Sequence, residues 1–174
     1  MPEYAAHLLR LVDECTPRLL GLPEEAVRGR PAPDKWSPAE ILGHLVDSAS
    51  NNHQRFVRGQ LQDPLVFPGY DQEAWVEAQR HRDAPWAELV TLWSSFNRHL
   101  ARVMTAVPPE VRDRPRTGHN FDVIAWRTIP ADEPASLGWF MADYVGHLEH
   151  HLRQILGEDL GRGATGQGTA PANG

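Results

Sequence analysis

Residues 35–48 read KWSPAEILGHLVDS and carry the clearest helix-start signal in the chain. Ser37, Pro38 and Glu40 match a capping box with proline at the first helical position, which predicts that a helix starts here. The apolar residues that follow recur at helical spacing, and the predicted helix runs to about Gly59.

Three further stretches have the apolar spacing of amphipathic helices. The first begins near Glu3, and Pro17 is expected to kink or end it. Connections rich in proline and glycine separate the stretches, and a short helix is predicted within one of them, at 72–79. The two remaining long helices are predicted to run from Asp83 or Ala84 to just before Pro108, and from near Ser136 to Leu156.

This pattern predicts an all-α fold, a four-helix bundle with long inter-helix connections. The connections could cross the bundle or cover one of its mouths. In the connection between Pro108 and Ser136, residues 121–126 fit either a strand-like piece or a packed turn. One domain is expected over residues 1–160, followed by a disordered low-complexity tail at 161–174.

The charge balance limits the partners that the chain can be expected to bind. It has 17 lysine and arginine residues against 23 aspartate and glutamate residues, a formal net charge of −6. This leaves no basic excess to neutralise phosphates, so neither nucleic acid nor a polybasic membrane contact is expected.

The single cysteine and the run of charges indicate the compartment. Cys15 alone excludes an intrachain disulfide and a cysteine-rich zinc site, and it fits a reducing environment. Charges interrupt the apolar run at the N-terminus, unlike a signal peptide, and no uncharged apolar run reaches ~18 residues. The expected location is therefore cytoplasmic, with no membrane span.

Nine histidines are a high number for 174 residues. His147 and His151 are four positions apart, so one helical turn places both imidazoles on one face, as a helix does when it offers two nitrogens to one metal ion. His44 is the best candidate for a third ligand, because a histidine beside the core needs a partner for its ring nitrogens. His150 points away from this pair and is interpreted as peripheral.

A simpler interpretation stays open, in which hydrogen-bonded histidines stabilise a metal-free bundle. The His-Glu-x-x-His pattern of metalloproteases is absent, so that chemistry is not supported. The five remaining histidines show no paired spacing and are assigned to surfaces or loops: His7, His53, His81, His99 and His119.

Two segments resemble the DinB/YfiT-like superfamily. Residues 35–48 resemble its Trp-Ser-x-x-Glu-x-x-x-His-Leu-x-Asp-Ser signature, and residues 144–155, YVGHLEHHLRQI, resemble its final helix with His-x-x-x-His followed by x-x-Gln-Ile. Residues 69–75 are similar to a connection found in one branch. The resemblance spans about Tyr4 to Leu156.

The resemblance implies a four-helix bundle with a divalent metal ion held by His44, His147 and His151. Zinc and nickel are the leading candidates, with iron and manganese as alternatives. It also implies homodimers and, in some branches, transfer or isomerisation with a low-molecular-weight thiol. A bound ion would hold that thiol as a thiolate, which then attacks an electrophilic substrate; activation of water for hydrolysis uses the same ligands. A non-enzymatic module that binds a metal or small ligand in a stress response is a further alternative.

Several polar side chains near these histidines are candidates for orienting them. Asp143 lies one turn before His147, while Asp47 and Ser48 follow His44 by three and four positions. Two residues further along the same helix could line a pocket, although a surface or dimer contact is the favoured interpretation: Asn52 and Arg55.

Overall fold

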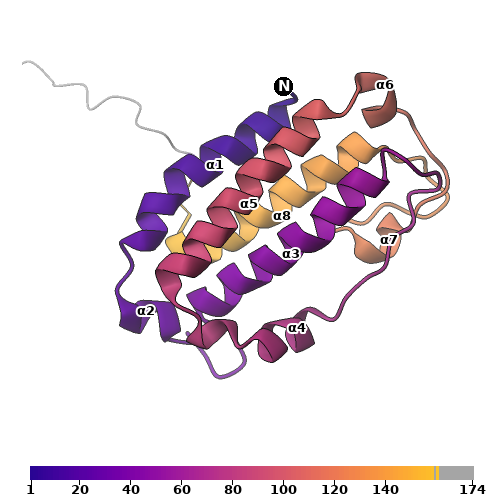
Figure 1. The fold of residues 1–174 in the computed structure, drawn as a ribbon. Coiled ribbons are helices and arrows are strands. Elements are labelled where there is room, and N and C mark those ends of the chain that lie inside the picture. The colour runs from indigo at the N-terminus through magenta and orange to yellow at the C-terminus, as the bar shows by residue number, and fades with distance from the viewer. Residues whose placement is uncertain (159, 161–174) are drawn as a thin grey trace, which may run out of the picture.

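The computed structural model describes residues 1–158 and residue 160. Four long helices form the body of the molecule (Figure 1). They are α1 (Glu3–Leu20), α3 (Pro38–Arg58), α5 (Trp86–Ala106) and α8 (Leu137–Leu156). The predicted tail at 161–174 lies outside the described residues.

The packing order follows from which helices touch. Both α1 and α3 pack against α5 and against α8, so α1 and α3 occupy opposite corners of the bundle. In Figure 1, α3 and α5 run in one direction, whereas α1 and α8 run in the other. The buried apolar side chains of all four helices meet in one core, with Trp93, Phe56 and Phe140 among its largest members.

The start of α3 is built as its sequence predicts. The Ser37 side chain accepts a hydrogen bond from the Glu40 backbone N–H, and the Glu40 carboxylate accepts one from the Ser37 backbone N–H, at 2.8 Å. Arg30 pairs with the same carboxylate. The capping box therefore fixes the register of the helix that carries His44.

The two long connections serve different purposes. Because α3 and α5 are parallel, the chain from Gly59 to Pro85 returns along the bundle, carrying α4 (Gln72–Gln79) and the 3₁₀ turn η1 (His81–Asp83) (Figure 1). Both elements pack against α3. The segment between α5 and α8 instead stays at one end, with α6 (Pro109–Arg112) and α7 (Phe121–Ile124).

The structure corrects two expectations about local structure. Pro17 does not end the first helix, which continues to Leu20, because the fixed φ of proline is compatible with a helix and only its own N–H is missing. The alternative expectation, a kink at Pro17, stays a prediction. Residues 121–124 form one helical turn, so the strand-like interpretation is wrong. Another short helix, α2 (Glu24–Arg28), precedes α3.

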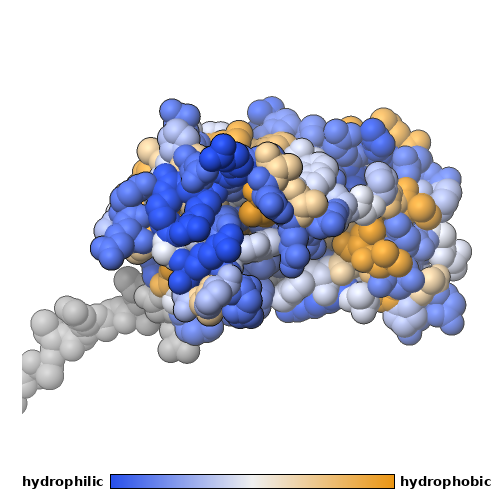
Figure 2. Space-filling view, turned by 90° about the horizontal axis from the view of Figure 1, so that it is seen from below, coloured by the Kyte–Doolittle hydropathy of each residue, from blue (hydrophilic) through white to orange (hydrophobic). Residues whose placement is uncertain are grey.

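The surface seen from below is mostly hydrophilic, with hydrophobic side chains gathered toward the right-hand end of the view (Figure 2). Within the described part of the chain, none of the helices combines the length and the apolar character that crossing a bilayer requires.

Candidate metal centre

Three histidines from two helices meet between α3 and α8. His44 comes from α3, and His147 and His151 come from successive turns of α8. One ring nitrogen from each lies within 4.8 Å of the others. The Nε2 atoms of His44 and His147 are 3.3 Å apart. The structure thus brings together the three side chains that the sequence singled out, in a group that could hold a metal ion.

The donor set fits a divalent ion by the separation of its nitrogens. Two nitrogens bound to one tetrahedral ion at about 2.0–2.1 Å would be separated by about 3.3 Å, which is the separation of the His44 and His147 Nε2 atoms. His44 is fully buried, and its Nδ1 atom has no hydrogen-bond partner among the described residues. An ion held by Nε2 would leave Nδ1 as it is, so the fit rests on the separation of the two Nε2 atoms.

The electrostatics of the cluster keep the imidazoles neutral, as metal ligation requires. Burial, reinforced by the neighbouring histidines, lowers the pKa of His44 to about 4 and the pKa of His147 to about 2. Burial also lowers the pKa of His151. At neutral pH each ring therefore offers a nitrogen lone pair.

The hydrogen bond between His151 and Gln154 settles which nitrogen faces the cluster. The His151 Nδ1 atom lies 2.7 Å from the Gln154 Oε1 atom, and the Gln154 Nε2 atom lies 3.2 Å from the His150 Nε2 atom. Because an amide oxygen only accepts, Nδ1 of His151 carries the proton and Nε2 is left with a lone pair. His150 is exposed and contacts Gln154, and it is not part of the three-histidine cluster.

The depressed histidine pKa values predict a pH dependence of the metal-free protein. Unfolded histidine has a pKa near 6.5, so below that pH the unfolded chain takes up protons that the folded chain excludes. The free energy of unfolding should fall as the pH drops from about 6.5 toward about 4, by about 1.4 kcal/mol per pH unit for each such histidine. Urea unfolding with a chelator present, at a series of pH values, measures this slope.

Two variants control this pH experiment. His147→Ala should flatten the slope, because it removes a buried neutral imidazole, whereas His150→Ala should keep it, because His150 is exposed. Equal slopes for the wild type and His147→Ala would contradict a neutral buried cluster.

Two histidines of the cluster each follow a glycine: Gly43 precedes His44, and Gly146 precedes His147. A Cβ atom on Gly43 would lie 2.1 Å from Cγ of His81, and one on Gly146 would lie 3.1 Å from Cζ3 of Trp126. Each glycine therefore allows a ring from a connecting segment to rest directly on the helix beside His44 or His147.

Asp47 and His81 form a buried pair next to the cluster. The Asp47 carboxylate approaches Nε2 of His81 at 3.2 Å with one oxygen and accepts a hydrogen bond from Gln79 at 2.7 Å with the other. Asp47 thus fixes the α4–η1 segment against α3, which corrects its expected role of orienting a ligand. His81 lies in the connecting segment, as assigned, but it is only 6% exposed and is therefore not a surface histidine.

Asp143 also binds a connecting segment instead of His147. Its two carboxylate oxygens accept hydrogen bonds from the backbone N–H groups of Trp126 and Arg127, both at 2.9 Å. Burial raises the pKa of Asp143, and the two hydrogen bonds, which lower it, offset only part of that effect. The carboxylate therefore holds the loop that covers His147, and its expected role of orienting that imidazole is not what the structure shows.

A polar cavity opens beside the cluster, with a volume of about 520 Å³. We call it the Arg55 cavity; its walls include Ser48, Asn52, Arg55, Tyr70, His147 and His151. Asn52 and Arg55 are each 6% exposed. The favoured interpretation of these two residues as surface or dimer contacts is therefore wrong, because the returning 59–85 connection covers this face of α3.

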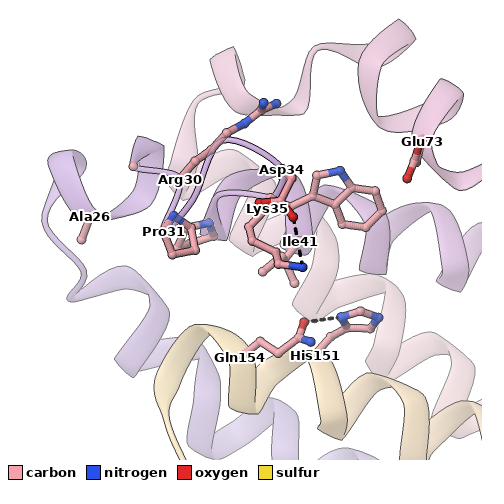
Figure 3. Close-up of a pocket in the computed structure, with 12 residues that line it drawn as sticks. Ala26, Arg30, Pro31, Asp34, Lys35, Ile41, Glu73, His151 and Gln154 are labelled. Carbon is pink, nitrogen blue, oxygen red and sulfur yellow. Dashed lines mark hydrogen bonds and ion pairs between the residues drawn. The ribbon is translucent and has the colours of Figure 1, made fainter.

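A second cavity lies on the other side of His151, with a volume of about 760 Å³. We call it the Trp36 groove; its walls include Pro31, Lys35, Trp36, Ile41, His151 and Gln154. Figure 3 shows His151 and Gln154 projecting from α8 toward the segment that carries Lys35 and Ile41. His151 is thus shared by the walls of both cavities.

Tertiary packing also pairs histidines that sequence spacing could not pair. The Nε2 atoms of His53 on α3 and His99 on α5 lie 3.3 Å apart at an exposed position. His119 is buried, and its Nε2 atom lies 2.7 Å from the carbonyl oxygen of Glu133. Because neither contact follows from helical spacing, only an alignment or a structure could reveal it.

Comparisons with known proteins agree with this fold. A family model of the DinB superfamily matches residues 7–155. Among solved structures, the chain is similar to YfiT from Bacillus subtilis, described as a probable metal-dependent hydrolase with an unusual four-helix bundle topology. The TM-score is 0.70 at 17% sequence identity, over 88% of this chain and 82% of that chain. No curated protein matches the sequence. The similarity to YfiT confirms the four-helix bundle, and the family model shows that this chain belongs to the DinB superfamily.

Proposed function

We propose that this protein is a metal-dependent enzyme that transfers a low-molecular-weight thiol to an electrophilic small molecule. The observation that carries the proposal is the convergence of His44, His147 and His151, whose ring nitrogens lie within 4.8 Å of one another beside an open cavity. Three protein ligands with one side open are typical of catalytic rather than structural metal sites.

A bound divalent ion would supply Lewis acidity, which lowers the pKa of a coordinated thiol or water. The protein holds three neutral imidazoles in place for that ion, with Gln154 fixing the proton position on His151. In the transfer itself, the thiol sulfur forms a bond to an electrophilic carbon of the acceptor. The leaving group departs with the electron pair of the broken bond, and the thiol proton passes to solvent.

The thiol in this proposal comes from a small molecule, because the protein's own cysteine is unsuited to the task. Cys15 is fully buried on α1, within the core. Burial raises the pKa of its thiol to about 12. A nucleophilic cysteine requires the opposite, a lowered pKa and access to the substrate.

The position of His151 between two cavities supports a reaction with two organic substrates. The Trp36 groove presents the apolar surfaces of Trp36 and Ile41, whereas the Arg55 cavity is lined mainly by polar groups. A thiol and an electrophile could therefore approach the same ion from different sides.

Metal-dependent hydrolysis is the second candidate function, and the description of YfiT favours it. It needs the same three histidines, with water in place of the thiol. The two functions differ in what they consume, so a single assay with and without thiol separates them.

The test uses protein that has been stripped with a chelator and reloaded with Zn²⁺ or Ni²⁺. It is incubated with a panel of thiols and either monobromobimane or chlorodinitrobenzene, and conjugate formation is followed. We expect turnover with at least one thiol that requires metal and is lost in His151→Ala. Ester or amide cleavage without thiol would instead support the hydrolase, and no turnover of either kind would support a binding module.

The metal identity and the oligomeric state belong to the same proposal. Imidazole ligands suit zinc and nickel, which we favour, as well as iron; manganese stays an alternative. Elemental analysis of untagged protein identifies the ion, and light scattering tests the proposed homodimer.

A further inference from the structure

The Arg55 cavity contains a buried cation that the metal chemistry does not use. Arg55 is 6% exposed and lies on α3. Its Nη2 group donates to the Pro68 carbonyl oxygen at 2.9 Å, and its Nη1 group lies 3.5 Å from the Asn52 Oδ1 atom. A guanidinium group has five N–H donors, so these two acceptors leave part of its capacity unused.

Among the described residues, no carboxylate forms an ion pair with Arg55. Asp143 lines the same cavity, but its two oxygens accept hydrogen bonds from the backbone at Trp126 and Arg127. Tyr70 is an acidic group whose charge would act on Arg55, but burial raises the pKa of Tyr70 to about 12, so it is uncharged at neutral pH. A buried charge without a counter-charge is costly to the fold and is usually explained by a ligand or a site.

The position of Arg55 relates it to the metal centre. His44, Ser48, Asn52 and Arg55 follow one another at intervals of four, four and three residues, so they form one stripe along α3. With a rise of about 1.5 Å per residue, the backbone at Arg55 lies about 16 Å along the helix from that at His44. The Arg55 cavity therefore extends from the histidine cluster toward a fixed positive charge.

We propose that Arg55, assisted by Asn52, binds a carboxylate group of the small molecule that occupies this cavity. The planar guanidinium matches a carboxylate in a two-pronged hydrogen bond, which explains an arginine here rather than a lysine. The substrate is then an elongated organic acid with its reacting end at the histidines and its carboxylate at Arg55. This inference rests on the proposed function, because it names the substrate class of the same site and takes the reaction at the histidines from that proposal.

The test compares ligands that differ only in the carboxylate. Protein reloaded with Co²⁺ is titrated with straight-chain ω-mercaptocarboxylic acids of increasing length, each against the ω-mercaptoalcohol of the same length. Formation of a cobalt–sulfur bond is read from its charge-transfer absorption. At one chain length we expect the wild type to bind the acid at least about tenfold more tightly than the alcohol, a difference of about 1.4 kcal/mol.

Variants assign that preference to Arg55. Arg55→Gln should reduce the acid-to-alcohol ratio to about one, chiefly by weakening the binding of the acid. Arg55→Lys should retain part of the preference, because it keeps the charge without the planar fork. Arg58→Gln is the matched control: it removes the same charge from the same helix at an exposed position, and it should behave as the wild type. Thermal unfolding of each variant checks that it folds.

In the cobalt titration, two outcomes would overturn the inference: a ratio of about one in the wild type at every chain length, or the same preference in Arg55→Gln. If no thiol gives a cobalt–sulfur band, the thiolate part of the proposed function fails. Calorimetry with the same pairs then decides the inference separately, because binding of the carboxylate to Arg55 does not require the sulfur–metal bond. No difference between acid and alcohol in that measurement would also overturn it.

Discussion

The His44→Ala variant is expected to lose tight metal binding, with a Kd for Zn²⁺ raised more than about 100-fold. Loss of a group that only supports a ligand weakens metal binding about 10–100-fold, so loss of a ligand should cost more. His44 alone bridges from α3 to the two histidines of α8, and its Nε2 atom lies 3.3 Å from that of His147. Competition with a chromophoric chelator measures the Kd.

The exposed histidine pair provides a matched control for this experiment. His99 and His53 also have Nε2 atoms 3.3 Å apart, yet that pair has only two histidines and lies at the surface. His99→Ala should therefore leave the high-affinity site intact. Unchanged Zn²⁺ affinity in His44→Ala, or an equal loss in His99→Ala, would contradict the three-histidine site and favour a metal-free bundle.

The Gly43→Ala variant is expected to unfold more easily than the wild type, by about 1–3 kcal/mol as for other overpacked cores. The added Cβ atom would lie 2.1, 2.3 and 2.5 Å from the Cγ, Cδ2 and Cβ atoms of His81. His81 has little room to retreat, because it is buried and held by Asp47. The higher helix propensity of alanine, worth about 1 kcal/mol, offsets only part of the clash.

Urea unfolding of the metal-free protein measures this effect, and two comparisons interpret it. Gly21→Ala adds a methyl group where the nearest atoms are 3.5 Å away, so its effect on stability should be small. Adding His81→Ala to Gly43→Ala removes two of the three closest atoms and should recover part of the loss. Wild-type stability in Gly43→Ala would show that His81 does not pack on α3 as described.

Features that depend on neighbours along the chain could be predicted from the sequence alone. The capping box of Ser37 and Glu40, the short helix at 72–79 and the end of the last helix near Leu156 are local, and the structure confirms each. The pairing of His147 with His151 is equally local, because a spacing of four residues fixes their common face. The expectation that Pro17 could end the helix is wrong, because the residues that follow a proline can keep helical geometry.

Which faces and side chains meet across segments could not be predicted without the packing of the helices and connections. His44 could be proposed as a partner for the α8 histidines, but the packing of α3 against α8 places it there. The same packing redirected Asp47 to His81 and Asp143 to the backbone at Trp126, and it buried Arg55 beneath the returning connection. The physical reason is that a polar helix face has the same spacing whether water, a connection or a cavity covers it. The contacts of each polar side chain therefore depend on which segment or cavity the fold brings against its helix face.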